Sequence, residues 1–129
     1  MKLKPFRPQD LEAFPGQPLL NDMTGLTLRR DDGTIVMCGG TILCPWGDEL
    51  WICVREDATR AEKIRIGRTA RSYVKALLEE RADIVWTSAS EGQDRWLKWL
   101  GFELDHLLKT QGVEVQRWRM TSGKAKAWA

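Results

Sequence analysis

The sequence predicts an α/β (α+β) fold: one domain with a twisted, mixed but mostly antiparallel sheet of about six to seven strands, flanked by helices. Three observations predict it. β-Prone segments separated by turn residues occupy 25–55, a second pair of strand-like segments lies within 102–120, and helix-periodic segments occur between them at 59–81 and 91–100. Strands mixed with two packing helices imply a sheet that carries helices on its faces.

The composition is that of a folded globular domain. Of the 129 residues, 43% are hydrophobic and 29% are charged, so the chain can bury a core and disorder is not expected. The net charge of +2 is too balanced to indicate a nucleic-acid or membrane partner. No apolar run approaches the roughly 20 residues of a membrane span, and the opening MKLKPFRPQD lacks the apolar region of a signal peptide.

The three cysteines, Cys38, Cys44 and Cys53, lie in apolar, strand-like sequence. An odd number does not fit a closed disulfide framework, and with His106 as the single histidine there is no metal-ligand spacing. We therefore expect reduced thiols in the core of a cytoplasmic protein, and no bound metal.

The first elements are short. Residues 2–7 alternate weakly between apolar and polar side chains and predict a strand, which Pro8 ends. Residues 9–14 predict a short helical turn that stops at Pro15-Gly16, and a loop follows. A strand and a helical turn thus precede the main group of strands.

The next segment predicts an antiparallel meander of three strands. Asp32-Gly33 separates the β-prone residues 25–30 from 34–44 and is a strong hairpin signal, because both residue types accept the backbone of a tight turn. A second turn at 45–48 leads into the strand 49–55. Alternation along this last strand places its odd-numbered residues on one face of the sheet and its even-numbered residues on the other.

Between residues 59 and 81 the apolar period changes to that of a helix. One face carries apolar side chains: Ile66, Ala70, Tyr73, Val74 and Leu77. Basic side chains lie on another face: Arg65, Arg68 and Lys75. This spacing predicts an amphipathic helix that packs its apolar face on the sheet, with Tyr73 as a structural residue of that face.

Residues 82–90 predict a buried strand, and residues 91–100 predict a second helix with Gly101 as its left-handed C-cap. Three apolar side chains of this helix have the i, i+3, i+4 spacing of a core face: Trp96, Trp99 and Leu100. The helix at 59–81 connects the fourth and fifth strands, which makes those two strands parallel neighbours.

The C-terminal region predicts a hairpin and a tail. Residues 102–109 and 113–120 are strand-like and flank a turn at 110–112. The residues after 120 are polar apart from Trp128. We therefore expect one domain over residues 1–120 and a loose tail over residues 121–129.

Four stretches resemble the GNAT superfamily of N-acetyltransferases. FRPQDLEAF, from Phe6, resembles its opening strand and helix; CGGTI, from Cys38, its glycine-bearing third strand; ELWICV, from Glu49, its fourth strand; and RWLKWLGFELD, from Arg95, its last helix-to-strand junction. This resemblance implies the GNAT fold, acetyl-CoA as the acyl donor and an amine of a protein or small molecule as the acceptor.

A narrower likeness concerns the pattern GG…PW-G…ELW together with RW…LGFE…G. Both resemble the small GNAT-like proteins of tailed phages and prophages, a group that includes an internal virion protein of podoviral phages. The resemblance implies a phage or prophage origin, a location in the host cytoplasm or the virion, and a phage structural or host protein as a further partner.

In the superfamily the fourth and fifth strands separate and the pantetheine arm of acetyl-CoA lies between them, which implies contacts with Ile52, Cys53 and Val54. The pyrophosphate binds amides at the start of the next helix, in a Q/R-x-x-G-x-G/A motif. Residues 62–67, EKIRIG, match it best: Gly67 is kept, but Glu62 and Arg65 replace the motif's first residue and first glycine.

Basic residues of this segment provide another way to hold a phosphate. Lys63, Arg65 and Arg68 can bind phosphate through their ammonium and guanidinium groups. A solvated basic helix face explains the same residues, and a nucleic-acid patch is a weaker reading because no aromatic residues are interleaved with them.

The catalytic apparatus is incomplete in the sequence. Many members carry a tyrosine, as general acid, three residues before the Gly-Phe pair. The family's LYEKLGF pattern places Leu97 at that position here. Glu49 occupies a position where some members hold a base for the amine. A charge or salt bridge at the strand end is the simpler interpretation of the same residue. Asp48 and His106 are weaker candidates.

Two main hypotheses follow. The chain is an acetyl-CoA-dependent N-acetyltransferase, or it is a catalytically inactive GNAT-fold phage protein with a structural or host-interaction role. The segment 8–24, which builds the acceptor pocket in the superfamily, is short here. The acceptor site is therefore either open, which suits a large partner, or lost.

Overall fold

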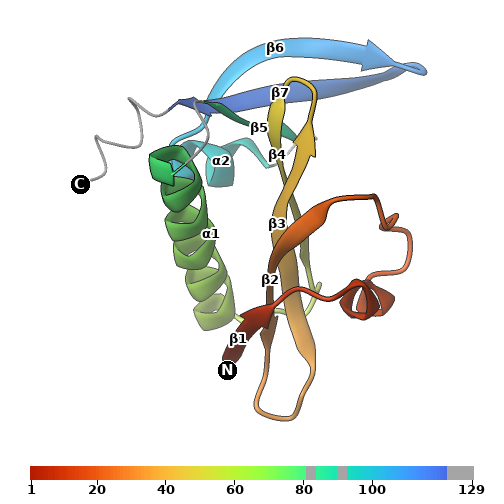
Figure 1. Ribbon diagram of the computed structural model, residues 1–129, viewed down its shortest axis with the longest axis vertical. Coiled ribbons are helices and arrows are strands. Elements are labelled where there is room, and N and C mark those ends of the chain that lie inside the picture. Colours follow the sequence, from red (N-terminus) through yellow and green to blue (C-terminus); the bar gives the residue numbers. More distant parts are fainter. Residues whose placement is uncertain (81–83, 90–92, 122–129) are drawn as a thin grey trace.

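Seven strands form one sheet in the order β1-β2-β3-β4-β5-β7-β6 in the computed structural model of the protein (Figure 1). The structure describes residues 1–80, 84–89 and 93–121. The strands are β1 (Lys2–Pro5), β2 (Met23–Arg29), β3 (Ile35–Cys44), β4 (Gly47–Val54), β5 (Ile84–Ala89), β6 (Glu103–Thr110) and β7 (Val113–Thr121). The helices are η1 (Pro8–Ala13, a 3-10 helix), α1 (Arg60–Glu80) and α2 (Asp94–Leu100).

The pairing of the strands confirms the predicted fold class. Every neighbouring pair is antiparallel except β4 and β5, which are parallel and joined through α1. A parallel pair needs a crossover connection, and a 21-residue helix provides it. The element order is the one that the sequence predicts.

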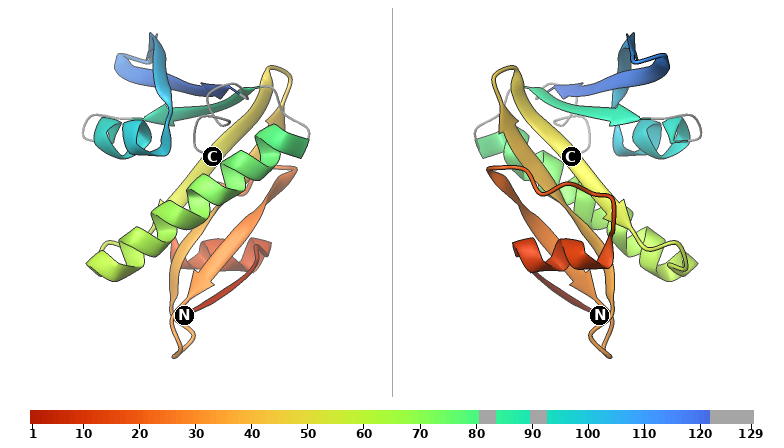
Figure 2. Two further views of the ribbon diagram at one scale, coloured as in Figure 1. Left: turned by 90° about the vertical axis from the view of Figure 1, so that its left-hand side faces the viewer. Right: turned by 90° about the vertical axis from the view of Figure 1, so that its right-hand side faces the viewer.

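The helices lie on opposite faces of the sheet (Figures 1 and 2). α1 and α2 cover one face, where they enclose the largest core cluster with Leu50 of β4. η1 lies against the other face, where Leu11 packs with Trp51 and Cys38. Leu50 and Trp51 are consecutive residues of one strand, so their separation into two clusters confirms the predicted alternation of β4.

The β2–β3–β4 meander begins and turns at slightly different residues from those predicted. β2 starts at Met23, two residues early, and β4 starts at Gly47 because the turn before it contains only Pro45 and Trp46. Gly25 and Gly40 face each other across β2 and β3. A Cβ atom on either would lie within 2.0 Å of a backbone oxygen of the other strand, so the close approach of these strands requires glycine.

The predicted C-cap of α2 is confirmed. Gly101 has φ 98°, and the Phe102 amide donates to the Leu97 carbonyl oxygen at 2.9 Å. The core face predicted for this helix is partly wrong, because Trp99 is 49% exposed while Leu97 and Leu100 are buried. The helix has only seven residues and packs on both α1 and β7, so its buried stripe is shifted by one position.

The prediction of three core thiols is also partly wrong. All three cysteines are free, but only Cys38 is buried, and burial raises the pKa of its thiol to about 11. Cys44 and Cys53 are half-buried. Cys44 is the last residue of β3, and Cys53, the last but one of β4, packs against the cluster of Leu11, Cys38 and Trp51.

Parts of the predicted segments lie outside the described residues: the ends of the strand 82–90, the start of the helix 91–100, and the tail 121–129 apart from Thr121, which ends β7. Within the described residues, none of the helices is long and apolar enough to cross a membrane.

Candidate active site

The parallel strands β4 and β5 pair over only two residues and then separate. Their last matched residues are Glu49 and Trp86. Just beyond, the Thr87 hydroxyl donates to the Leu50 carbonyl oxygen at 3.2 Å, which places this carbonyl on the β5 side of β4. We call the space between the diverging strands the fork.

Beyond this point, none of the described strands pairs with β4 on the side of the fork. N–H and C=O groups of alternate residues point to the same side of a strand, so those of Ile52 and Val54 share the side of the Leu50 carbonyl. Arg55 lies on the opposite side, where its amide donates to the Val36 carbonyl oxygen of β3 at 2.8 Å. Donors and acceptors of Ile52 and Val54 are therefore available to a ligand in the fork.

Two adjoining cavities occupy the fork. The outer one has a volume of about 390 Å³. Its lining comes from β4, α1 and the start of α2: Ile52, Val54, Lys63, Ile66, Gln93 and Trp96. Its walls are mostly apolar, with one cation at the end formed by the first turn of α1. An elongated ligand with an alkyl arm and an anionic group fits this distribution.

The inner cavity, of about 250 Å³, is lined by residues from both faces of the sheet. It shares Ile52, Gln93 and Trp96 with the outer cavity. Trp96 and Leu97 line it on the face of α2, and Gln17 and Glu49 on the face of η1. A ligand held along α1 can thus meet a second molecule that enters from the other face of the sheet.

Glu49 is held by two donors at one of its oxygens. Its Oε1 accepts hydrogen bonds from the Trp46 indole at 3.0 Å and from the Arg117 guanidinium, which also forms an ion pair with it. Arg117 donates in addition to the Ser88 hydroxyl at 2.6 Å. Among the described residues no group bonds to Oε2, so this oxygen can accept a proton or a hydrogen bond from a molecule in the inner cavity.

The first turn of α1 is closed by a capping box. The Thr59 amide donates to Glu62 Oε1 at 2.9 Å, and the Glu62 amide donates to the Thr59 hydroxyl at 3.2 Å. Arg30, in the β2–β3 turn, donates two hydrogen bonds to the Glu62 carboxylate. The hydrogen bonds from Arg30 lower the pKa of the Glu62 carboxyl most, the bond from the Thr59 amide lowers it further, and the resulting pKa is about 2. Glu62 is the acidic residue in the motif that binds phosphate in the superfamily. Its negative charge is neutralised here by Arg30.

The motif match at residues 62–67 lies inside α1 and not in a loop before it. Lys63 lines the outer cavity. Arg65 and Arg68 do not line it, because they lie about 200° and 140° around the helix from Lys63. Gly67 allows α1 and α2 to approach closely, because a Cβ atom there would lie 2.9 Å from the ring of Trp99. Of the basic residues predicted to hold phosphate, the fold brings only Lys63 to the fork.

The remaining predicted residues are distributed over both faces. Cys53 points to the η1 face, where its thiol donates to Gln17 Oε1 at 3.5 Å. Asp48 is buried on the face of α1. His106 pairs with Asp105, at 2.5 Å between Nδ1 and Oδ2.

Neither candidate for the acid provides a proton donor in the fork. Leu97 is buried and lines the inner cavity. Tyr73 packs against the core, and its hydroxyl lies 3.4 Å from the Thr41 hydroxyl. The prediction of Tyr73 as a structural residue agrees with this packing.

Sequence reasoning missed several residues of the fork. Gln17, Ser88 and Gln93 lie in or beside loops and carried no motif, and Arg117 reaches Glu49 from 68 residues away. Trp96 was expected in the core, but it is half-buried and lines both cavities. Only its position at the start of α2, before the Gly-Phe pair, could have indicated this.

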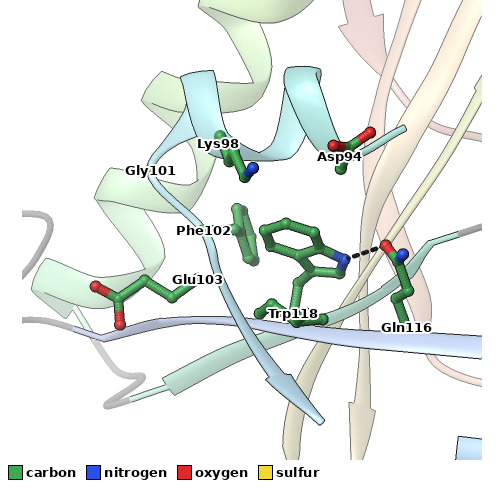
Figure 3. Close-up of a pocket in the computed structure, with 8 residues that line it drawn as sticks. Asp94, Lys98, Gly101, Phe102, Glu103, Gln116 and Trp118 are labelled. Carbon is green, nitrogen blue, oxygen red and sulfur yellow. Dashed lines mark hydrogen bonds between the residues drawn. The ribbon is translucent and has the colours of Figure 1, made fainter. Parts of the chain in front are cut away.

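A larger hollow, of about 470 Å³, lies outside the fork between α2 and the β6–β7 hairpin (Figure 3). Trp118 forms its floor, and its indole donates to Gln116 Oε1 at 3.1 Å. Asp94 and Lys98 bound it from α2. α2 separates it from the fork, because Gln93, Trp96 and Leu97 face the other way.

The comparisons by sequence find no relative. No protein-family model matches the chain, and no curated protein is similar to it at a significant level. Likeness to other proteins therefore rests on the three-dimensional arrangement.

Solved structures with the same arrangement are N-acetyltransferases. A spermidine/spermine N-acetyltransferase from Vibrio cholerae superimposes with a TM-score of 0.71 at 11% identity, over 99% of this chain and 98% of that chain. The ribosomal-protein-S18-alanine N-acetyltransferase from Escherichia coli gives 0.71 at 13% identity, over 93% and 92%. A putative acetyltransferase from Acinetobacter baylyi gives 0.62 at 10% identity, over 78% and 64%. The chain has the fold of the GNAT acetyltransferases.

Proposed function

We propose that the chain is an acetyl-CoA-dependent N-acetyltransferase that transfers an acetyl group to an amine. One observation carries the proposal: β4 and β5 separate after Glu49 and Trp86 and leave a cavity that is lined from both faces of the sheet. The solved structures with this fold are named acetyltransferases, which adds support by analogy.

The residues of the fork fit acetyl-CoA. Ile52, Ile66 and Trp96 offer apolar walls to an alkyl arm, and the free backbone groups of Ile52 and Val54 suit its amides. Lys63 would meet the phosphates at the first turn of α1, where the helix dipole also favours an anion. Acetyl-CoA supplies the acyl group in activated form, as a thioester.

Glu49 is the residue that can take the proton of the amine. Glu49 lines the inner cavity and its Oε2 has no described partner, while Trp46 and Arg117 hold Oε1 in place. Leu97 cannot protonate the departing thiolate, so water must do so. Holding amine and thioester together in the fork provides most of the rate enhancement, because correct orientation alone is a large effect.

Calorimetry with acetyl-CoA and an assay for released thiol test the proposal. We expect micromolar binding of acetyl-CoA and amine-dependent thiol release. Glu49→Gln should lower kcat about 100-fold, the usual effect of losing a general base, with unchanged affinity for acetyl-CoA. Glu114→Gln, on the exposed tip of the β6–β7 hairpin, is the matched control. Binding weaker than millimolar would exclude the enzyme.

The origin and location of the protein are finer parts of the proposal. The likeness of PW-G…ELW and RW…LGFE to phage GNAT-like proteins supports a phage or prophage origin and a location in the host cytoplasm. Phage genes on both sides of its own gene would support this origin, and a chromosomal setting without them would count against it.

The competing function is that of an inactive virion or host-interaction protein. Leu97 at the position of the acid and Glu62 at the phosphate motif favour it. The open fork and the neutralisation of Glu62 by Arg30 favour the enzyme instead. Mass spectrometry of purified particles, together with the calorimetry above, separates the two functions.

A further inference from the structure

The face of β5, β7 and β6 opposite α1 and α2 carries no helix in the described part of the chain. η1 lies against β2, β3 and β4, and the β6–β7 hairpin extends beyond the rest of the sheet (Figure 1 and Figure 2, right). We call this surface the open face. Trp86 and Ser88 of β5 belong to it, because Val85 and Ala89, which flank them in the strand, are buried in the α1–α2 core.

The open face is rich in aromatic and aliphatic side chains. Trp86 and His106 meet edge to face with ring centroids 6.4 Å apart. Leu108 lies two residues along β6 from His106 and is 47% exposed, and Val113 is 61% exposed on the same side of β7. Exposed apolar groups that gather on one face indicate a surface that binds a macromolecule.

The open face is continuous with the mouth of the inner cavity. Arg117 lies on it, with its guanidinium 5.5 Å from the centre of the Trp86 ring, and the same guanidinium bonds to Glu49 and Ser88 at the fork. Trp46, 60% exposed, stands on the other side of Glu49. A molecule that lies on this face therefore ends beside Glu49.

The charge at this mouth does not suit a polycation. Among the described residues that line the inner cavity, Glu49 is the only acidic one, and it is already paired with Arg117. Further along, Asp105 is paired with Arg119 at 3.3 Å. A polyamine needs several unpaired carboxylates, whereas a polypeptide needs apolar contacts and hydrogen-bond partners such as Gln17 and Ser88.

We propose that the open face docks a polypeptide whose N-terminal α-amino group enters the fork beside Glu49 and is acetylated there. This inference rests on the proposed function and names its acceptor. In the transfer, a bond forms between the amine nitrogen and the acyl carbon as the carbon–sulfur bond breaks; the amine proton passes to Glu49, and water protonates the thiolate.

The α-amino group is chosen as the acceptor because the candidate base, Glu49, is a carboxylate. Of the described residues that line the inner cavity, only Glu49, a carboxylate, can act as a base. The acceptor should therefore be an amine that is easily deprotonated, and an α-amino group has a pKa of about 7.7–8.0, against about 10.4 for lysine.

The acceptor class is tested on the full chain with acetyl-CoA and three acceptors. These are random peptides with free N termini and no lysine, the same peptides N-terminally acetylated and carrying one internal lysine, and spermidine. We expect the free N termini to be acetylated at least about ten times faster per amine, as the pKa difference implies. Equal or faster acetylation of lysine or spermidine overturns the inference, as does binding of acetyl-CoA with no acetylation of N termini. Failure to bind acetyl-CoA overturns the proposed function itself, so the two failures are distinguishable.

The docking surface is tested by two neighbouring residues of β6 on opposite faces. Leu108→Asp places a charge on the open face, and Leu107→Asp places one on the α2 face, where Leu107 is 54% exposed. Leu108→Asp should raise KM for the peptides about five-fold or more, with acetyl-CoA affinity and kcat unchanged. Leu107→Asp should change KM less than about two-fold. Equal effects of the two variants would overturn the docking face.

Discussion

Arg30 and Glu62 form a two-point ion pair that joins the β2–β3 turn to the first turn of α1. Arg30 Nε lies 2.9 Å from Glu62 Oε2, and its Nη2 lies 3.0 Å from Oε1. The pair connects residues 32 positions apart in sequence. It orients the start of the helix beside the outer cavity and cancels the charge of the one carboxylate in the candidate phosphate motif.

This pair makes stability depend on acidity. Because folding lowers the pKa of Glu62 from 4.5 to about 2, the ionised carboxylate stabilises the protein above about pH 4.5, and this contribution is lost as the pH falls through about 2. Glu62→Gln should unfold at lower urea concentration at pH 7 and lose less stability than the wild type between pH 4.5 and 2. Exposed Glu79→Gln is the control. Identical acid dependence in Glu62→Gln and wild type would contradict the assignment.

Lys63 should contribute more to acetyl-CoA affinity than the neighbouring arginines. It lines the outer cavity, whereas Arg65 points about 200° away around the helix. Reversing a charge that contacts phosphate should cost about 1.4 kcal/mol or more, which is ten-fold in Kd. Calorimetry should show this loss for Lys63→Glu and less than about a three-fold change for Arg65→Glu. A larger effect at Arg65 would mean that the phosphates bind on another face of α1.

Tyr73 should be dispensable for transfer. Its hydroxyl contacts the Thr41 hydroxyl of β3, and Tyr73 lines neither cavity of the fork. Tyr73→Phe should leave kcat within about two-fold of the wild type, whereas loss of a general acid costs about 100-fold or more. Its free energy of unfolding should fall by about 1 kcal/mol or less, the value of one hydrogen bond. A ten-fold loss of kcat would identify Tyr73 as the proton donor.

Gly67 and Trp99 should be energetically coupled. A methyl group at Gly67 would meet the Trp99 ring at 2.9 Å, although alanine is about 0.5–1 kcal/mol better than glycine inside a helix. Gly67→Ala should therefore be more stabilising by about 1 kcal/mol in a Trp99→Ala background than in the wild type. Urea unfolding of the four proteins in the cycle measures this coupling. Additive effects would show that the two helices do not touch at this point.

Much of the fold could be predicted from local patterns. Asp32-Gly33 marks the β2–β3 hairpin, the apolar period from Ile66 to Leu77 marks α1, and Gly101 caps α2. These features depend on neighbours within a few residues, so their physics is contained in short segments. Trp99 could not be placed in this way, because its exposure depends on how α2 meets α1.

The sequence by itself determined the strand and helix order, the parallel β4–β5 pair and the face on which each β4 side chain lies, because periodicity and crossover geometry decide them. Only the tertiary structure decided which charges meet. It brought Arg117 to Glu49 and Arg30 to Glu62, and it turned Arg65 away from the fork while leaving Lys63 beside it. Such contacts depend on distances between segments far apart in the chain, which the packing of the whole sheet and its helices sets.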